Sequence, residues 1–249
     1  MPASANGAPV ALITGAARRI GAVIARELHA AGYDLALHYR HSTTEMQALC
    51  MELEARRAGS TLSIAADLAD AAAAPVLVEA TVARFGQIDA LVNNAACFYA
   101  TPLATTTPEQ FDDLVGTNVR APFFLCQAAA VHLAQQHGAI VNIADIYAER
   151  PLPGHAAYCI SKAGIVMLTR ALAQELGPDV RVNAVAPGNM LWSTNPVKAE
   201  TPDMVESRTA LHRQGTPQDI AEAVLFLLRD ANYCTGMVMP VDGGRLLHI

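Results

Sequence analysis

Short apolar runs alternate with longer segments of helical periodicity along almost the whole chain. The short runs are rich in aliphatic and β-branched residues, as strands are, and the longer ones repeat Ala and Leu at helical spacing. Seven strands are predicted, at Val10–Thr14, Leu35–Tyr39, Leu62–Ala66, Ala90–Asn93, Ala139–Ile143, Arg181–Ala186 and Met237–Val241. Six helices are predicted between them, near Arg19–Ala31, Thr44–Arg57, Ala71–Phe85, Pro108–Ala134, Ala156–Leu176 and Pro217–Leu228.

This alternation indicates the fold class. Strands that are apolar throughout are expected where helices cover both faces of a sheet. The sequence therefore predicts an α/β fold, a single-domain Rossmann-type, doubly wound parallel seven-stranded sheet with helices on both faces. No repeat or linker divides the chain, so one domain is expected over residues 8–249.

Helical and strand periodicity both fail at residues 187–216. A non-periodic stretch of this length is either a functional lid or a surface excursion. Because it follows the sixth strand, at the edge where open α/β sheets bind ligands, we predict a substrate lid.

Composition narrows the classes of protein and partner. The chain has 249 residues, 52% of them hydrophobic, and a net charge of −6, which indicates a globular protein. Without a block of Lys and Arg, neither nucleic acid nor a membrane surface is expected as a partner. The five cysteines form no Cys-x-x-Cys pair, residues 1–9 lack the features of a secretory signal, and Ala121–Ala134 is too short to span a bilayer. A cytoplasmic protein without disulfides is expected.

A glycine turn follows the first strand. It reads Thr-Gly-Ala-Ala-Arg-Arg-Ile-Gly from Thr14 to Gly21 and leads directly into a helix. Glycines allow close backbone approach, and a helix N-terminus offers free N–H groups to a pyrophosphate. Arg19 stands where the usual three-glycine pattern has its middle glycine. Taken alone, this turn is equally consistent with a plain connection between strand and helix.

The end of the second strand indicates which dinucleotide is bound. NAD-specific sites place Asp or Glu there to accept from the ribose 2′-hydroxyl, whereas this chain has Arg40, His41 and Ser42. These donors, with Arg19 from the glycine turn, suit a 2′-phosphate, so NADP(H) is the predicted cofactor. Asp67, after the third strand, is either an acceptor for the adenine amino group or a helix N-cap.

Tyr158 and Lys162 lie four residues apart, on one face of a predicted helix. A nearby ammonium is expected to lower the pKa of the phenol and make it a usable proton donor. Together with the glycine turn, the Asn-Asn-Ala of Asn93–Ala95, Asn118 and Pro187–Gly188, this pair resembles the short-chain dehydrogenase/reductase family over nearly the whole chain.

The resemblance implies a role for each matching position. Tyr158 would be the proton donor, Lys162 its activator and a ribose ligand, and Asn118 the organiser of a water relay to that lysine. The residues predicted to bind NADP(H) are Gly15, Arg18, Arg19, Ile20, Gly21, Tyr39, Arg40, His41, Ser42, Asp67, Leu68, Asn94, Ala95, Ala96, Tyr158, Lys162, Pro187 and Gly188. The resemblance also implies a homotetramer with the Pro108–Ala134 and Ala156–Leu176 helices at an interface.

One residue departs from the family pattern. Most members have a serine after the fifth strand, where this chain has Asp145. An ionised carboxylate only accepts hydrogen bonds and repels a carbonyl oxygen that gains negative charge, which disfavours simple ketone reduction. A C=N bond needs a proton at nitrogen, which a carboxyl group paired with a tyrosine can relay. A buried aspartate beside a phenol is also expected to have a raised pKa.

Asp145 and the arginine in the glycine turn are similar to the pteridine reductase branch of the family. Further support comes from the segments 37–42, 94–99 and 101–103. The resemblance implies that Phe98 covers one face of a planar pterin, although a core aromatic is the alternative. It also implies a serine where this chain has Ala96. The residues predicted to bind substrate are Arg19, Ala96, Phe98, Asp145, Tyr158, Asn189, Met190, Leu191 and Trp192.

The predicted activity is thus NADPH-dependent reduction of a dihydropterin or dihydrofolate, with Asp145, Tyr158, Lys162 and Asn118 as catalytic residues. A carbonyl or sugar reductase of the same fold and a non-catalytic NADP sensor are the alternatives. His155 is expected to start a helix or contact the lid, and Cys97 to act as a small apolar residue. No metal site is expected, since no histidine pair has ligand spacing backed by carboxylates.

Overall fold

A parallel sheet forms the centre of the molecule. The computed structural model describes residues 7–190 and 201–247. The strands are β1 (Val10–Ile13), β2 (Asp34–Tyr39), β3 (Thr61–Ala65), β4 (Ala90–Asn93), β5 (Ala139–Ile143), β6 (Arg181–Pro187) and β7 (Val238–Val241). They form one seven-stranded sheet in the order β3-β2-β1-β4-β5-β6-β7, with every neighbouring pair parallel. The predicted fold class is confirmed.

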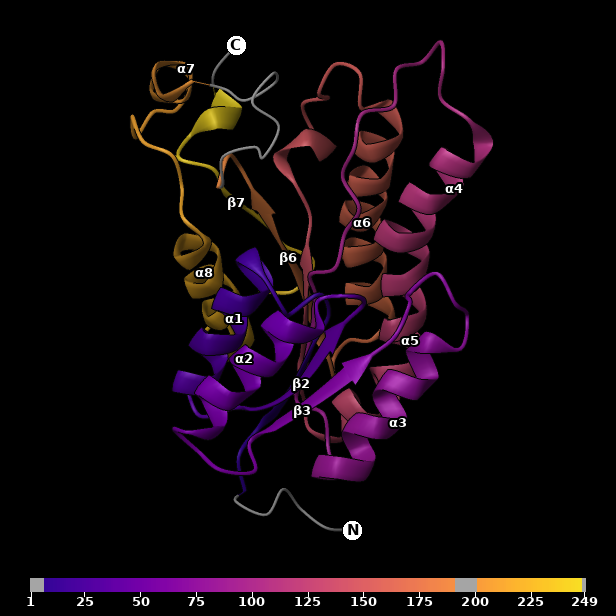
Figure 1. The fold of residues 1–249 in the computed structure, drawn as a ribbon, viewed down its shortest axis with the longest axis vertical. Coiled ribbons are helices and arrows are strands. Elements are labelled where there is room, and N and C mark those ends of the chain that lie inside the picture. The colour runs from indigo at the N-terminus through magenta and orange to yellow at the C-terminus, as the bar shows by residue number, and fades with distance from the viewer. Residues whose placement is uncertain (1–6, 191–200, 248–249) are drawn as a thin grey trace.

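Helices cover both faces of the sheet (Figure 1). The helices are α1 (Arg19–Ala30), α2 (Thr43–Glu54), α3 (Ala73–Phe85), α4 (Pro108–Val115), α5 (Ala121–Gln135), α6 (Ala156–Glu175), α7 (Pro202–Ser207) and α8 (Pro217–Arg229). One apolar core lies between the sheet and α1, α2 and α8, and the other between the sheet and α3, α5 and α6. Because of these two layers, β1, β4 and β5 bury every residue, which explains their apolar sequences.

Two predicted segments differ from the structure. The predicted helix at Pro108–Ala134 is interrupted between α4 and α5 by a π-helical turn at Gly116–Arg120. An inserted π turn leaves the surrounding helical periodicity nearly intact, so the hydrophobic pattern does not reveal it. The segment predicted to be non-periodic, 187–216, contains the short helix α7, which begins with the hydroxyl cap of Thr201 and a proline.

The chain reverses its direction of winding beside β1. This strand pairs with β2 on one side and with β4 on the other, and the helices that follow β1 and β4 lie on opposite faces. In open α/β sheets such a reversal leaves a crevice at the carboxyl ends of the strands, where ligands bind. The predicted site residues follow these strand ends.

Arg181, at the start of β6, ties the sheet to the end of α8. Its guanidinium donates to the carbonyls of Leu227, Leu228 and Ala231 at 2.7, 2.7 and 3.1 Å. The Leu227 and Leu228 carbonyls lie in the last turn of α8 and lack partners within the helix, so the Arg181→Met variant should lose about 2–3 kcal/mol of unfolding free energy. Urea denaturation measures this loss.

Arg229→Met is the matched control for Arg181→Met. Arg229 belongs to α8 as well, but its ion pair with Asp230 is solvent-exposed, so its loss should cost far less stability than the loss of Arg181. Equal losses in the two variants would contradict the capping role of Arg181.

Candidate active site

The turn after β1 is built for close backbone approach. Gly15 has φ of +63°, and a Cβ on Gly21 would stand 2.2 Å from the Gly15 carbonyl oxygen. Arg19 also has a positive φ, of 53°, a left-handed conformation that glycine adopts without strain. The first turn of α1 contains no acidic residue, and its N-cap residue, Arg18, makes no side-chain capping bond. These features fit a pyrophosphate on the N-terminus of α1.

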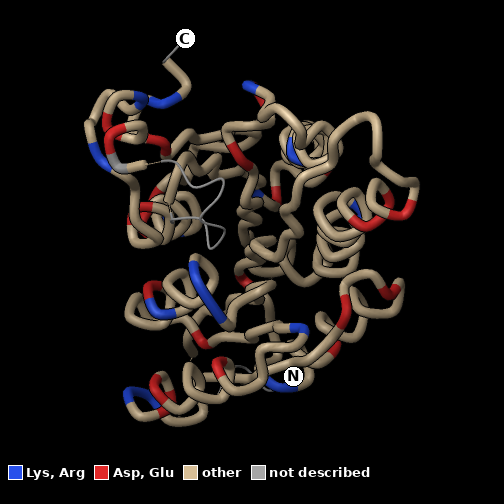
Figure 2. Tube along the Cα trace, turned by 45° about the horizontal axis from the view of Figure 1, so that its top comes forward, with Lys and Arg blue, Asp and Glu red and all other residues tan. Residues whose placement is uncertain are grey.

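Charged side chains surround this turn. Arg18 lies 3.6 Å from Glu45 of α2, and Arg40, after β2, lies 3.9 Å from Asp67, after β3. All four side chains are exposed, and such pairs contribute about 1 kcal/mol or less, so both guanidinium groups can turn toward an added phosphate. Elsewhere on the described chain, acidic and basic residues are interspersed (Figure 2). The arginines fit the 2′-phosphate of NADP(H).

The remaining residues predicted near the adenosine end differ in exposure. Asp67 is not the N-cap of α3, which begins after Ala72; its carboxylate instead accepts from the Ala69 N–H at 3.0 Å. Its N-cap alternative is therefore wrong. The others of this group are His41, which is exposed; Ile20, Tyr39 and Ser42, which are partly buried; and Leu68, which is buried.

Thr14 and Asn94 join the glycine turn to the loop after β4. The Thr14 hydroxyl accepts from the N–H groups of Asn94 and Ala95, at 2.9 and 3.0 Å. The Asn94 amide donates to the carbonyls of Thr14 and Gly15, at 2.8 and 3.1 Å. Two of the predicted cofactor residues, Asn94 and Ala95, thus lie directly against the turn.

Asp145, Tyr158 and Lys162 come together between β5 and α6. The Tyr158 hydroxyl donates to the Asp145 carboxylate at 2.7 Å. The other carboxylate oxygen accepts from the Tyr147 N–H at 2.9 Å, which fixes its direction. The Lys162 ammonium is buried, donates to the Ile143 carbonyl at 2.8 Å and lies 5.8 Å from the centre of the Tyr158 ring. The predicted catalytic contact between acid and phenol is present.

The protonation of these groups differs in part from the expectation. Burial, followed by the charge and hydrogen bond of Asp145, raises the pKa of Tyr158 well above 10. The predicted lowering of this pKa by Lys162 is wrong, because burial disfavours the phenolate and the Asp145 carboxylate in contact with the hydroxyl adds to that effect. Burial raises the pKa of Asp145, as predicted, against the opposing effects of the Tyr147 and Tyr158 hydrogen bonds and the Lys162 charge. The pair therefore holds protons more tightly than isolated residues would.

The stability of the protein relative to a Lys162→Met variant should increase from pH 8 to pH 10. Burial lowers the pKa of Lys162 to about 8, against the attraction of Asp145. Below pH 8 both folded and unfolded lysine are protonated, and the cost of burying the charge is at its full value. Between pH 8 and pH 10 only the unfolded chain keeps this proton, so the wild type gains stability that methionine cannot supply. Denaturation of both proteins at several pH values measures this; a constant difference would contradict it.

Asn118 lies in the π-helical turn between α4 and α5. Its amide oxygen accepts from the Cys97 N–H at 2.8 Å, and its amide nitrogen donates to the Cys97 carbonyl at 3.0 Å and to the Ser161 hydroxyl at 2.9 Å. The Ser161 hydroxyl in turn donates to the Tyr158 carbonyl at 2.7 Å. Asn118 therefore connects the loop after β4 to the helix that carries Tyr158 and Lys162.

Phe98 stands at the rim of the site and is 57% exposed, so its alternative as a core aromatic is wrong. Its ring stacks on His155 at 5.1 Å and meets the Tyr158 ring edge-on at 4.7 Å. His155 precedes α6 as its N-cap residue, which confirms its expected place at a helix start. Ala96, two residues before Phe98, is also exposed. An exposed aromatic next to the phenol offers a face for a planar ligand.

The predicted lid residues lie partly outside the described chain. Pro187 ends β6, and the Gly188 N–H donates to the Val241 carbonyl at 3.0 Å. Asn189 accepts from the Gln214 amide at 2.6 Å. The side chain of Met190 is buried in the core that contains α8. Two further predicted substrate residues, Leu191 and Trp192, lie outside the described residues.

Three residues near the site were not singled out from the sequence: Thr14, His38 and Ser161. All three are polar and less than 3% exposed. Thr14 and Ser161 make the contacts described above, and His38 hydrogen-bonds to the glycine turn. A polar residue within an apolar run was the sequence feature that could have identified them. This feature is clearest for His38, in the strand Asp-Leu-Ala-Leu-His-Tyr.

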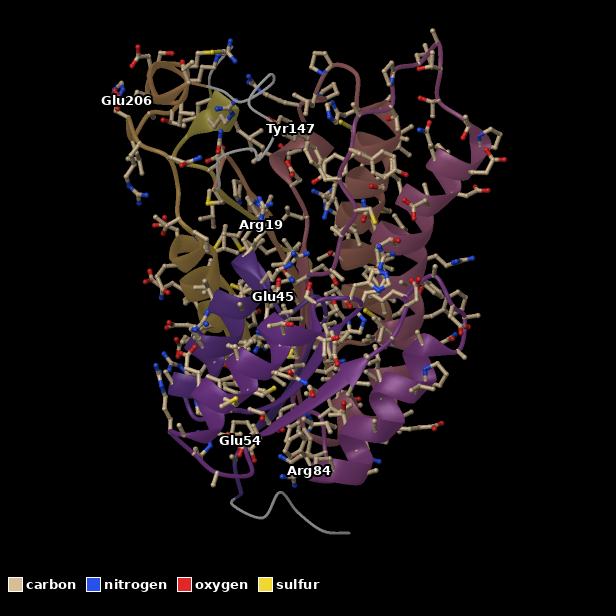
Figure 3. The ribbon with its side chains drawn as sticks, in the orientation of Figure 1. Arg19, Glu45, Glu54, Arg84, Tyr147 and Glu206 are labelled. Atoms are coloured by element: carbon tan, nitrogen blue, oxygen red, sulfur yellow. The ribbon has the colours of Figure 1, made fainter. Side chains whose placement is uncertain are left out.

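The site lies at one end of the molecule. Figure 3 shows Arg19 at the start of α1 and Tyr147 after β5 in the upper half of the view, with Glu54 and Arg84 at the opposite end. Among the described residues one helix, α6, is long and apolar enough to cross a membrane, but 61% of its most apolar stretch is buried inside the fold. All five cysteines are free thiols. In the described part of the chain, no group of three or more His, Cys, Asp or Glu side chains is placed to hold a metal ion.

Three features of the site define a dinucleotide-dependent oxidoreductase: a phosphate-binding turn, the arginines beside it, and a buried phenol with a lysine. The chain belongs to the short-chain dehydrogenase/reductase family: the family model described as enoyl-(acyl carrier protein) reductase matches residues 15–245.

Relatives with different substrates resemble the chain to a similar degree. It is 39% identical, over 99% of its length and all of the relative's, to a protein of Streptomyces violaceoruber assigned as a ketoacyl reductase of the granaticin polyketide synthase. It is 35% identical to pteridine reductase 1 of Leishmania tarentolae, with 96% and 97% of the two chains covered. It is 36% identical to the 3-oxoacyl-(acyl-carrier-protein) reductase FabG of Staphylococcus aureus, with 95% and 98% covered.

A solved structure has the same fold. The blue fluorescent protein from a metagenomic library, in complex with NADPH, superposes with a TM-score of 0.88 at 37% sequence identity, and 95% and 97% of the two chains are covered.

Proposed function

We propose that this protein is an NADPH-dependent pteridine reductase, which reduces a C=N bond of a dihydropterin or dihydrofolate. The cofactor is NADP(H), in agreement with the arginines beside the glycine turn and with the NADPH-bound structural relative. When bound, NADPH supplies a hydride to a ring carbon of the substrate, and the protein must supply a proton to the neighbouring nitrogen.

The observation that carries the substrate class is the Tyr158–Asp145 hydrogen bond of 2.7 Å. A ketone gains negative charge at oxygen during reduction, and Asp145 beside the phenol would oppose that charge whenever its carboxyl group is ionised. A ring nitrogen instead accepts a proton. Because burial raises the pKa of the Asp145 carboxyl, this pair holds a proton for a nitrogen more readily than an isolated carboxyl group would.

Each residue of the site has a defined role in this proposal. Tyr158 passes its hydroxyl proton to the substrate nitrogen and regains a proton from Asp145. Lys162 lies behind the phenol, where its charge favours ionised Asp145 after the transfer. Asn118 holds the loop after β4 against α6.

Phe98 provides the exposed aromatic surface that a planar pterin requires. It borders Tyr158 directly, so a ring stacked on it would lie within reach of the phenol. Arg19 is proposed to contact both cofactor and substrate. Five further residues are proposed to complete the substrate pocket: Ala96, Asn189, Met190, Leu191 and Trp192.

Reduction of a ketoacyl or other carbonyl substrate is the second candidate. The 36–39% identity to ketoacyl reductases favours it. In that case Asp145 would be a structural residue. The remaining alternative is a non-catalytic NADP sensor. This alternative does not explain why Tyr158, Lys162 and Asn118 are present together.

A substrate panel separates these functions. NADPH oxidation is followed with dihydrobiopterin, dihydrofolate, a ketoacyl thioester and several ketones. Turnover of a pterin without comparable ketone turnover supports the proposal. Strong turnover of ketones or thioesters without pterin turnover contradicts it, and no turnover of any substrate favours the sensor.

We also propose a cytoplasmic homotetramer. The faces of α5 and α6 expose several large apolar side chains, namely Phe123, Phe124, Val131, Ile160 and Met167. Exposed large apolar side chains on two neighbouring helices are typical of an interface between subunits. Light scattering of the purified protein should give four times the mass of the chain, and a monomer that persists at micromolar concentration would contradict this assembly.

A further inference from the structure

His38 is the penultimate residue of β2 and lies in an otherwise apolar stretch of that strand. It is 2% exposed. Its Nδ1 lies 3.2 Å from the Gly15 backbone nitrogen, and its Nε2 lies 3.1 Å from the Ala66 carbonyl oxygen. A backbone N–H only donates and a carbonyl only accepts, so both bonds form in a single state of the ring, with the proton on Nε2 and none on Nδ1.

The backbone of the same residue holds the next position of the turn. The His38 carbonyl accepts from the Ala16 N–H at 2.9 Å. His38 therefore binds both Gly15 and Ala16 of the turn. Its ring also connects the turn to Ala66, which follows β3. Gly15 has a positive φ, a conformation that glycine leaves readily when nothing holds it.

We propose that His38 is a positioning residue for NADP(H): its neutral imidazole holds the Gly15 amide, and protonation of Nδ1 releases the phosphate-binding turn. A protonated ring would direct an N–H at the Gly15 N–H, so two donors would face each other. Cofactor affinity would then fall as His38 gains a proton. The proposal concerns the cofactor only and stands whichever substrate is reduced.

The charges around His38 set the pH range of this effect. Burial lowers the pKa of His38, against the opposing hydrogen bond to Ala66 and the charge of Asp67. The other charged groups at this edge are Arg18 and Arg19 from the turn, Arg40 after β2 and Glu45 of α2, and all of them are exposed. Protonation of His38 therefore occurs below the usual histidine range, and the loss of affinity is expected below pH 6.5.

Two variants test the ring chemistry. In His38→Asn, the amide oxygen stands at the same number of bonds from the backbone as Nδ1 and accepts from Gly15 without titrating in this range. Its Kd for NADPH at pH 7.5 should stay within about threefold of the wild type. His38→Leu removes the acceptor, and its Kd should rise about tenfold or more, the cost of an unsatisfied buried N–H.

The experiment measures the Kd of the full-length protein for NADPH by nicotinamide fluorescence from pH 7.5 to pH 5. The 2′-phosphate of NADPH also titrates, near pH 6, so all proteins share a weakening from that source. The wild type should show a further rise in Kd, of about tenfold, that His38→Asn lacks. His29→Asn is the matched control: His29 is also buried but pairs with Ser60, and this variant should follow the wild type.

The same profile measured with NADH separates the two titrations, because NADH has no 2′-phosphate. A rise in the wild-type Kd for NADH at acid pH supports the proposal, and a flat profile overturns it. An acid rise of equal size in His38→Asn and wild type also overturns it, as does wild-type affinity in a folded His38→Leu. If His38→Leu does not fold, the comparison of wild type with His38→Asn decides.

Discussion

The Asp145→Ser variant is expected to reduce dihydrobiopterin about 10²–10³ times more slowly than the wild type, in kcat/KM, and to gain activity on ketones. In the proposed mechanism Asp145 is the acid that returns a proton to Tyr158, and the substitution removes it. It also removes the negative charge that opposes a developing oxyanion and puts a hydroxyl donor in its place. NADPH oxidation with each substrate measures both changes.

The Asp145→Asn variant distinguishes proton donation by Asp145 from the effect of its side-chain shape. The amide is isosteric with the carboxyl group and can accept the Tyr158 hydrogen bond, but it cannot supply a proton. It should lose pterin activity to about the same extent as Asp145→Ser without gaining ketone activity. Pterin turnover within threefold of the wild type in both variants would mean that Asp145 has only a structural role.

The Tyr158→Phe variant should lower kcat for pterin reduction by about 10²–10⁴. In the proposed mechanism the proton reaches the substrate through the phenol, and no other hydroxyl hydrogen-bonds to Asp145 among the described residues. Affinity for NADPH should change little, because the ring remains in place. Stopped-flow measurement of the reduction step and a fluorescence titration of NADPH separate the two quantities.

Tyr233→Phe is the matched control for Tyr158→Phe. It removes the same hydroxyl from a tyrosine whose side chain is fully exposed at the surface. Its kcat should equal that of the wild type. A Tyr158→Phe variant that keeps more than a tenth of the wild-type kcat would exclude the phenol as the proton donor.

The sequence predicted the sheet well, because buried parallel strands leave unbroken apolar runs. β1, β4 and β5 are buried at every position, and all three were located within one residue. The π-helical turn at Gly116–Arg120 was not predicted, since a single wide turn hardly alters helical spacing. Helix α7 was missed because six residues are too few to show a period.

The candidate site was predicted in its residue types but not in its electrostatics. Spacing alone placed Tyr158 and Lys162 on one helix face, and it suggested that the lysine would control the phenol. The distances reverse this: Asp145 is in contact with the phenol, while Lys162 donates to a backbone carbonyl. Such competition between neighbours depends on three-dimensional distances, which no sequence pattern contains. The same reason explains why His38, distant in sequence from the glycine turn, was missed.

A competition assay tests the proposed substrate class most directly. The wild-type enzyme, NADPH and equal concentrations of dihydrobiopterin and an acetoacetyl thioester are mixed, and both products are quantified at early times. The product ratio equals the ratio of the two kcat/KM values. The acid beside Tyr158 predicts at least about a hundredfold excess of tetrahydrobiopterin, a difference of roughly 2.8 kcal/mol in transition-state stabilisation. An excess of the hydroxyacyl product would contradict the pteridine reductase proposal.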